Sequence, residues 1–187
     1  VGVTGDYIQR ATKLVDEGCK VLCVDVAHGH HVIMRHALQT LRNTFGTSIY
    51  IVAGNIATQR AVYDLAQWGA DCVKVGVGGG SCCKTRVVTG HGVPMFSCLI
   101  DCCEAADKAG VNVIADGGIR SSGDIVKSIA AGADMVMLGS MLSGTSETPG
   151  DAVFINGEKY KNFRGMASRA AMDSRSDRNL SHTAPEG

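Results

Sequence analysis

Residues 68–77 read WGADCVKVGV, and this stretch decides the fold. A Gly that follows a helical segment leads into a short, mostly apolar run, which ends at a second Gly. The same form recurs at 131–140, AGADMVMLGS. Gly at the end of a helix adopts a left-handed conformation at little cost. A nearly continuous apolar run is typical of a strand in a buried parallel sheet. The repeated pattern therefore predicts helix–turn–strand units.

Further units of this kind extend in both directions along the chain. The predicted strands are 1–3, 21–26, 49–54, 72–77, 112–116 and 135–139. Apolar residues at helical spacing predict helices over about 7–15, 32–41, 58–66 and 122–129, capped in the last two cases by Thr58 and by Ser121 or Ser122.

Repeated units of this type indicate an α/β protein. Polar and Gly residues gather where the predicted strands end, which is where a (β/α)8 barrel (a TIM barrel) holds its active site. Six strands cannot close such a barrel, so we expect one partial catalytic domain over 1–187 that lacks the first two strands. An open Rossmann-like sheet is the alternative.

The chain changes character after residue 150. Val153-Phe154-Ile155, Asn156-Gly157 and Lys159-Tyr160-Lys161 predict a hairpin within 150–166, with a type I′ turn at Asn-Gly. Residues 173–187 are polar and have little apolar periodicity, so we expect a mobile flap there.

Composition limits the kinds of partner. Lys+Arg and Asp+Glu both number 18, so the formal net charge is zero, and no apolar run is long enough to span a bilayer. These observations argue against nucleic-acid and membrane partners. The eight Cys include no C-x-x-C pair, which favours reduced thiols, mostly buried, in a cytoplasmic protein.

The segment 76–86, GVGGGSCCKTR, combines a dense run of Gly with a cysteine beside two cations. Gly lets the backbone approach a ligand closely, and nearby Lys84 and Arg86 favour the nucleophilic thiolate of Cys83. The chemistry alone leaves a buried structural thiol equally open.

Two later strands end in Asp116-Gly117-Gly118 and in Gly139-Ser140. Barrel enzymes commonly bind phosphate at the corresponding loops, where backbone N–H groups face the anion, and Asp116 can accept hydrogen bonds from ribose hydroxyls. Tight turns that need Gly only for geometry are the alternative.

Asp25 and Asn55 end earlier strands, and four His lie nearby at 28, 30, 31 and 36. Taken singly, Asp25 and Asn55 fit a cap or a turn as well as a binding site. The spacing of the His does not match a zinc-binding helix, so no zinc site is expected.

Taken together, these segments resemble the IMP dehydrogenase/GMP reductase family over nearly the whole chain. The matching strings are GVGGGSCCKTR, TGHGVP, IADGGIRSSGDI, MVMLGSMLSGTSETPG, YKNFRGMAS and APEG. Their order and spacing are more specific than any one string. The resemblance implies a (β/α)8 barrel, usually tetrameric, whose third strand is the first one present here.

The resemblance also implies roles for individual residues. Cys83 would attack C2 of the purine, and Thr85 and Glu186 would shuttle protons. Substrate would be held by Ser81, Asp116, Gly117, Gly118, Gly139, Ser140, Gly165, Met166 and Ala167. Asp25, Asn55 and Lys74 would lie near the nicotinamide of the cofactor, and the carbonyls of Gly78, Gly80 and Cys83 would bind a monovalent cation such as potassium. Phe163 stands where the family often has Tyr, and Ala167 where it often has Gly or Ser.

The two branches of the family differ in the flap. The dehydrogenase activates water with an Arg-Tyr pair, and the matching residues here are Arg178-Asn179. Asn carries no phenol, and the flap is short, so we expect a GMP reductase that uses NADPH. IMP dehydrogenase with NAD is the alternative, supported by FRGMAS, GSM and SDR. A catalytically inactive nucleotide-binding paralogue or fragment is the third possibility.

Overall fold

The computed structural model describes residues 1–166 and 168–174, and over the first 142 of them helices alternate with strands except where α4 is followed by α5. In chain order these elements are α1 (Tyr7–Asp16), β1 (Val21–Asp25), α2 (Val32–Phe45), β2 (Tyr50–Ile56), α3 (Gln59–Gln67), β3 (Cys72–Val75), α4 (Thr85–Thr89), α5 (Met95–Ala109), β4 (Asn112–Asp116), α6 (Ser122–Ala130), β5 (Met135–Met137) and the 3-10 helix η1 (Ser140–Leu142). The chain continues with β6 (Ala152–Ile155), β7 (Glu158–Lys161) and α7 (Arg169–Asp173).

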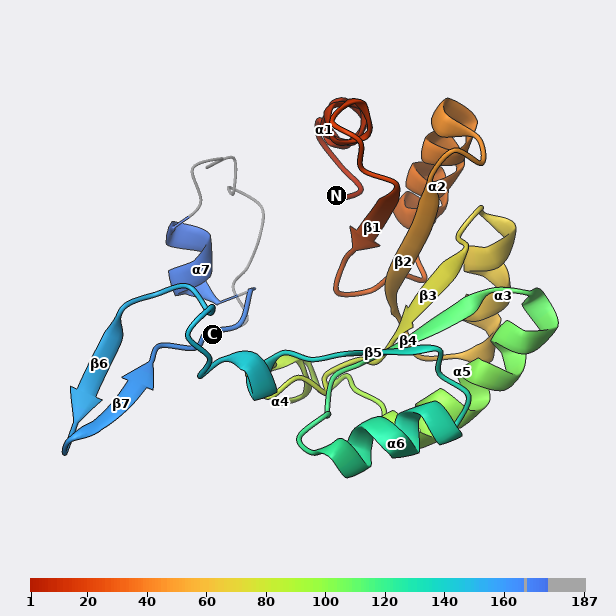
Figure 1. The fold of residues 1–187 in the computed structure, drawn as a ribbon. Coiled ribbons are helices and arrows are strands. Elements are labelled where there is room, and N and C mark those ends of the chain that lie inside the picture. Colours follow the sequence, from red (N-terminus) through yellow and green to blue (C-terminus); the bar gives the residue numbers. More distant parts are fainter. Residues whose placement is uncertain (167, 175–187) are drawn as a thin grey trace.

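The first five strands form one parallel sheet in the order β1-β2-β3-β4-β5, and α2, α3, α5 and α6 lie along its outer side (Figure 1). An open doubly wound sheet would reverse its strand order at a switch point, whereas a (β/α)8 barrel adds each strand beside the last. The unbroken order therefore excludes the Rossmann-like alternative. The sheet is an arc of a (β/α)8 barrel.

The predicted strands agree with this sheet, with one exception. Residues 1–3 form no strand; Val1 only donates its amino group to the carbonyl of Cys23 (2.7 Å) and accepts from the N–H of Asp25 (3.3 Å). These two bonds place Val1 alongside β1, but the chain then turns away through Thr4-Gly5. Only one residue is therefore paired, and the prediction of a strand over 1–3 is wrong.

The core lies between the sheet and the outer helices. On β1, Leu22 and Val24 are buried while Val21 and Asp25 are exposed. In contrast, all four residues of β3 are buried, including Lys74. The expectation of strands buried on both faces thus holds at the centre of the arc. It is wrong for β1, β4 and β5, whose inner-facing residues no other described layer covers.

Helix ends follow the predicted capping. The hydroxyl of Thr58 accepts a hydrogen bond from the N–H of Ala61 (3.2 Å), and Ser121, rather than Ser122, caps α6 by accepting from the N–H of Asp124 (3.3 Å). Four of the eight Cys are buried (Cys72, Cys98, Cys102 and Cys103), and the other four are partly buried.

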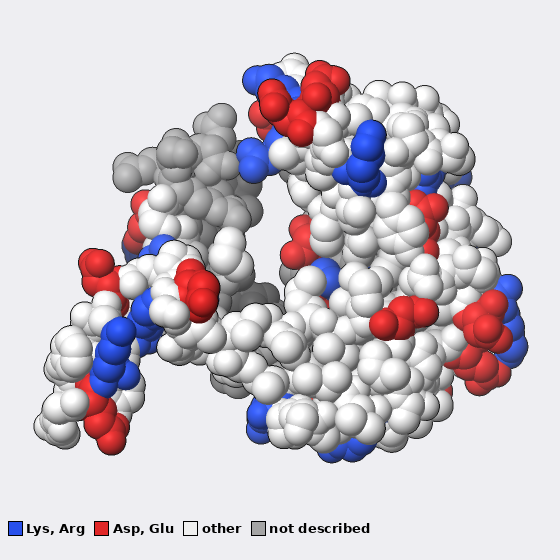
Figure 2. Space-filling view, in the orientation of Figure 1, with Lys and Arg blue, Asp and Glu red and all other residues white. Residues whose placement is uncertain are grey.

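The hairpin β6–β7 projects from the body of the molecule (Figure 1). Asn156 and Gly157 both have positive φ (53° and 82°), as a type I′ turn requires, which confirms the predicted turn. Figure 2 shows acidic and basic side chains interspersed over one face of the molecule. No helix in the described part of the chain is long and apolar enough to cross a membrane.

Candidate active site

A cavity of about 780 Å³ lies at the carboxyl ends of β3, β4 and β5. Its wall is formed by Gly80 to Lys84, by Asp116 to Ile119, by Met137 to Ser140, and by Phe163, Arg164, Gly165, Met166 and Ser168. Small-molecule sites commonly have volumes of about 300–1,000 Å³. The cavity is therefore large enough for a nucleotide, and it occupies the end of the strands where barrel enzymes bind their substrates.

Glycines allow the loops after β3 and β4 to touch through their backbones. Gly76 has a φ of +139°, and a Cβ atom there would lie 2.1 Å from the carbonyl oxygen of Asp116. Gly117 has a φ of +103°, and a Cβ there would lie 3.0 Å from the carbonyl carbon of Gly79. No larger residue fits either position without moving the facing backbone. The Gly-rich run thus lets the loop after β3 make close backbone contact with the loop after β4, so two walls of the cavity touch.

Cys83 lies in the cavity wall, partly buried, directly before the short helix α4. Its N–H donates to the carbonyl of Gly80 (3.0 Å), and this turn directs the residue out of the glycine run. Its thiol donates to the hydroxyl oxygen of Thr85 (3.2 Å). A thiol at a cavity wall, with a hydroxyl as its partner, is accessible to a ligand in the cavity.

Cys82 also lines the cavity, but it contacts a different segment. Its sulfur lies 4.0 Å from the carbonyl oxygen of Phe163, and its own carbonyl lies 3.2 Å from where a Cβ on Gly165 would be. Cys82 therefore packs the loop after β3 against residues 163–165.

The opposite wall offers backbone N–H groups. Among the described residues, the N–H groups of Gly118, Gly139 and Ser140 donate no hydrogen bond, and all three residues line the cavity. Gly118 has a φ of +77°, which its lack of a side chain permits. Groups of unpaired N–H donors at such turns bind anions. This wall can therefore hold a phosphate.

Residues 163–166 and Ser168 close a further side of the cavity. Phe163 and Met166 line it, and the guanidinium of Arg164 donates to the carbonyl of Ala170 (2.8 Å) and to the hydroxyl of Ser174 (2.8 Å). Arg164 thereby ties this loop to α7.

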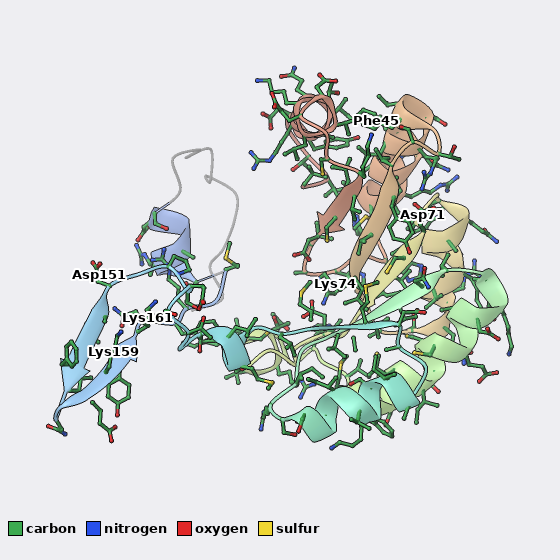
Figure 3. The ribbon with its side chains drawn as sticks, viewed as in Figure 1. Phe45, Asp71, Lys74, Asp151, Lys159 and Lys161 are labelled. Atoms are coloured by element: carbon green, nitrogen blue, oxygen red, sulfur yellow. The ribbon has the colours of Figure 1, made fainter. Side chains whose placement is uncertain are left out.

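Beneath the cavity lies a buried ammonium group, that of Lys74, with 3% of its side chain exposed (Figure 3). It is 2.5 Å from Oδ2 of Asp116 and 3.1 Å from Oδ1 of Asp25, and it donates to the amide oxygen of Asn55. Burial alone would lower the pKa of Lys74, but the hydrogen bond and charge of Asp116, with those of Asp25, raise the pKa above its usual value. Lys74 is thus a cation held by two carboxylates.

The fold brings together most of the residues singled out in the sequence. Those that line the one cavity are Ser81, Cys83, Asp116, Gly117, Gly118, Gly139, Ser140, Gly165 and Met166. Thr85 joins them through Cys83, and Asn55 and Lys74 join through Asp116. Gly78 and Asp25 do not line the cavity. Ala167 and Glu186, with Arg178-Asn179 and the rest of 175–187, lie outside the described residues.

Several wall residues were not singled out as site residues. Ile119, Met137 and Leu138 follow or end the strands β4 and β5, so the rule that active sites form at strand ends could have found them. Arg164 lies within the string FRGMAS, but no sequence rule shows that its side chain turns toward α7.

Two of the four His near Asp25, His30 and His31, have structural contacts. Nε2 of His30 pairs with Oδ2 of Asp64 (2.9 Å), which lowers the pKa of Asp64 together with the larger effect of the hydrogen bond from Arg60. His31 caps α2 by accepting from the N–H of Ile33 (3.2 Å). No group of three or more metal-ligating side chains occurs in the ranges the structure describes.

The arc of parallel strands, the Gly-rich loops and the cavity with its thiol and anion-binding wall define a barrel protein with a nucleotide-sized site. A family model described as "IMP dehydrogenase / GMP reductase domain" matches residues 1–187. The chain belongs to the IMP dehydrogenase/GMP reductase family.

Individual relatives come from both branches of this family. The chain is 50% identical to inosine-5'-monophosphate dehydrogenase of Mycobacterium tuberculosis over 94% of its length and 33% of that protein. It is 48% identical to GMP reductase of Leishmania major over its whole length and 40% of that protein. It therefore spans about a third to two fifths of these relatives.

The solved structures agree with this placement. The crystal structure of GMP reductase C318A from Trypanosoma brucei in complex with guanosine 5'-monophosphate superposes on the whole chain with a TM-score of 0.94 and 47% identity, and 39% of that protein is covered. The expected family and partial barrel fold are confirmed.

Proposed function

We propose that the protein is a purine-nucleotide oxidoreductase, and specifically a GMP reductase that converts GMP to IMP and ammonia through a covalent bond between Cys83 and C2 of the purine. One observation carries the proposal: the thiol of Cys83 shares a single cavity with Asp116 and with the unpaired N–H groups of Gly118, Gly139 and Ser140. A nucleotide that placed its phosphate on those donors would bring its base toward the thiol.

Different residues of the cavity are proposed to bind the phosphate, the ribose and the base of the nucleotide. In this proposal Ser81, Gly117, Gly118, Gly139 and Ser140 bind the phosphate. Asp116 accepts from the ribose hydroxyls, because a carboxylate at a cavity wall suits paired hydroxyl donors. Gly165 and Met166, followed by Ala167, contact the base on the side opposite the phosphate.

Cys83 carries the chemistry in this proposal. Its thiolate adds to C2 of guanine, and the exocyclic amino group leaves as ammonia once it has been protonated. After C2 accepts a hydride, the C–S bond breaks, Cys83 leaves as the thiolate and IMP is released. Thr85, 3.2 Å from the sulfur, and Glu186 are the proposed carriers of the protons.

A nicotinamide dinucleotide would supply the hydride, and the family implies such a cofactor. Residues of this chain fit it at the carboxyl ends of β1 and β2, beside the cavity: Asp25 is 59% exposed on its side chain and offers a carboxylate to ribose hydroxyls, and Asn55 lies between it and Asp116. We propose NADPH for the reductase, with NAD as the cofactor of the alternative activity.

A monovalent cation, proposed as potassium, would be bound by the carbonyls of Gly78, Gly80 and Cys83. The donor type fits, since hard cations prefer oxygen ligands. The carbonyl of Gly80 already accepts from the N–H of Cys83, but a carbonyl has a second lone pair for the ion.

IMP dehydrogenase is the second candidate, and the 50% identity to the Mycobacterium tuberculosis enzyme favours it. An inactive nucleotide-binding paralogue is the third. Assays of the full chain with GMP and NADPH, and separately with IMP and NAD, distinguish them. Consumption of NADPH that depends on GMP supports the reductase. Formation of NADH from IMP and NAD instead supports IMP dehydrogenase. Binding of GMP without turnover in either assay indicates the inactive paralogue.

We also propose that residues 1–187 belong to one catalytic barrel domain, with the hairpin 150–166 and a flap over 173–187, in a cytoplasmic homotetramer. Exposed apolar side chains on separate elements, including Val87, Phe96 and Phe154, provide surface for subunit contacts. Light scattering of the purified protein tests the assembly, and a monomer at micromolar concentration would contradict it.

A further inference from the structure

Lys74 is buried beneath the candidate active site although it carries a positive charge. Its side chain is 3% exposed, whereas Asp25 and Asp116, which it bridges, are 59% and 23% exposed. The ammonium group therefore has little access to a ligand, while both of its carboxylate partners do. A buried cation is stable only when it is paired and hydrogen-bonded, and its partners here come from β1, β2 and β4.

Asp25 and Asp116 each contact Lys74 through only one of their two carboxylate oxygens. Oδ2 of Asp116 accepts from Lys74 at 2.5 Å and from the amide nitrogen of Asn55 at 2.9 Å, and among the described residues Oδ1 accepts no hydrogen bond. Oδ1 of Asp25 faces Lys74 at 3.1 Å, and Oδ2 has no partner in the described part of the chain. Each carboxylate is fixed on its inner side and has one oxygen available to a ligand.

The two carboxylates adjoin different spaces. Asp116 ends β4 and lines the cavity, whereas Asp25 lies at the exposed end of β1, three strands away. Lys74 on β3 lies between them, and Gly54 on β2 makes room for its backbone, because a Cβ on Gly54 would lie 2.6 Å from the carbonyl oxygen of Lys74. One ammonium therefore orients groups of two neighbouring subsites.

We propose that Lys74 is a positioning residue that contacts neither ligand and instead holds Asp116 toward the nucleotide and Asp25 toward the nicotinamide dinucleotide. This inference rests on the proposed function, which supplies the two ligands. It differs from the direct cofactor contact that the family resemblance implies for Lys74. Its consequence is that removing one buried charge weakens the binding of two ligands that Lys74 does not touch.

The remaining polar groups around Lys74 cannot replace it. The nearby thiol of Cys23 has a pKa raised by burial and by the charge of Asp25, so it stays neutral, and Asn55 is neutral in all conditions. Without the ammonium, Asp25 and Asp116 would be two unbalanced carboxylates that repel each other. Either they would move apart or one would bind a proton, and both changes spoil the acceptor positions.

The test measures binding of GMP and of NADP⁺ by calorimetry in the full chain carrying Cys83→Ala, which prevents turnover. Lys74→Met should weaken both ligands by about ten-fold or more, the scale of hydrogen bonds to charged groups. Lys74→Arg, which keeps the charge, should restore most of both affinities. Asp116→Asn should weaken GMP alone, and Asp25→Asn should weaken NADP⁺ alone. Lys108→Met, in an exposed pair with Glu104, is the matched control and should change neither.

Other patterns overturn the inference. Loss of NADP⁺ binding alone in Lys74→Met would indicate a direct cofactor contact, and unchanged binding of both ligands would leave Lys74 a purely structural role. Thermal melting checks that each variant folds; if Lys74→Met does not fold, a folded Lys74→Arg that has lost both affinities overturns the inference. If the protein without these substitutions binds neither GMP nor NADP⁺, the proposed function fails instead.

Discussion

The sulfur of Cys83 and the hydroxyl oxygen of Thr85 lie 3.2 Å apart, one on each side of the point where α4 begins. The first turn of the helix thus fixes the separation of the two groups. The hydrogen bond places the proposed nucleophile directly beside one of the two proposed proton carriers.

The first prediction concerns the two adjacent cysteines. Cys83→Ala should abolish turnover of the full chain, because no other group supplies the C–S bond, while Cys82→Ala should keep much of the activity, since Cys82 only packs against residues 163–165. The rate of the GMP- and NADPH-dependent reaction is the measurement. Equal losses in both variants would count against Cys83 as the nucleophile.

A second prediction concerns the ribose contact. Asp116→Ala should weaken nucleotide binding by about 1–3 kcal/mol, the scale of a hydrogen bond to a charged group. Calorimetric titration with GMP on the Cys83→Ala background measures this without turnover. An unchanged affinity would remove Asp116 from the nucleotide site.

Glycine substitutions test the contact between the two loops. Gly76→Ala should lower the free energy of unfolding by about 2 kcal/mol or more, because the new Cβ would lie 2.1 Å from the backbone oxygen of Asp116 and because φ is positive. Gly144 has nothing within 4 Å of its Cβ position and no positive φ, so Gly144→Ala is the control and should be close to neutral. Denaturant unfolding gives both values, and similar stabilities for the two variants would show that the loops do not touch.

A pH-dependent prediction follows from the N-terminus of α6. Asp124 accepts from the hydroxyl of Ser121 (3.0 Å) and the N–H of Arg120 (3.1 Å) and pairs with Lys127 (2.9 Å). The Lys127 hydrogen bond, followed by those from Arg120 and Ser121, lowers the pKa of Asp124 to about 2. The folded-state pKa lies below the unfolded value of about 3.9, so the stabilisation is complete above that value. It is lost as the pH falls from about 4 to 2.

Asp124→Asn should therefore reduce the slope of stability against pH over this window and leave the slope at neutral pH unchanged. Thermal melts of both proteins between pH 2 and pH 7 measure the effect. The same slope in the variant would mean that the capping contacts of Asp124 do not persist in solution.

The repeated helix–turn–strand units were enough to predict the sheet. The strand over 112–116 agrees with β4 at both ends, and Thr58 caps α3 as expected. The bounds of helix α5 do not follow from the sequence, because its buried face consists largely of Cys and Ala, which contrast weakly with polar neighbours. The failed strand at 1–3 had only its apolar Val residues in its favour, and pairing depends on what lies beside a segment rather than on its own composition.

The sequence predicts most residues of the cavity wall, but it does not predict the cluster around Lys74 beneath the cavity. Residues next to Gly-rich turns are visible in the sequence, since the turns mark strand ends. The burial of Lys74 between Asp25 and Asp116 is not visible, because it depends on the register that places β3 between β2 and β4. A lysine in an apolar strand shows only that a partner must exist.

The backbone contact between the loops at Gly76 and Gly117 also limits how this site can change. Because each loop occupies the volume that a side chain on the other would need, a substitution in one is tolerated only together with a shift of its counterpart. The two segments must therefore diverge as a pair. New substrate preferences would arise more readily at Phe163 and Met166, whose side chains line the cavity and are exposed.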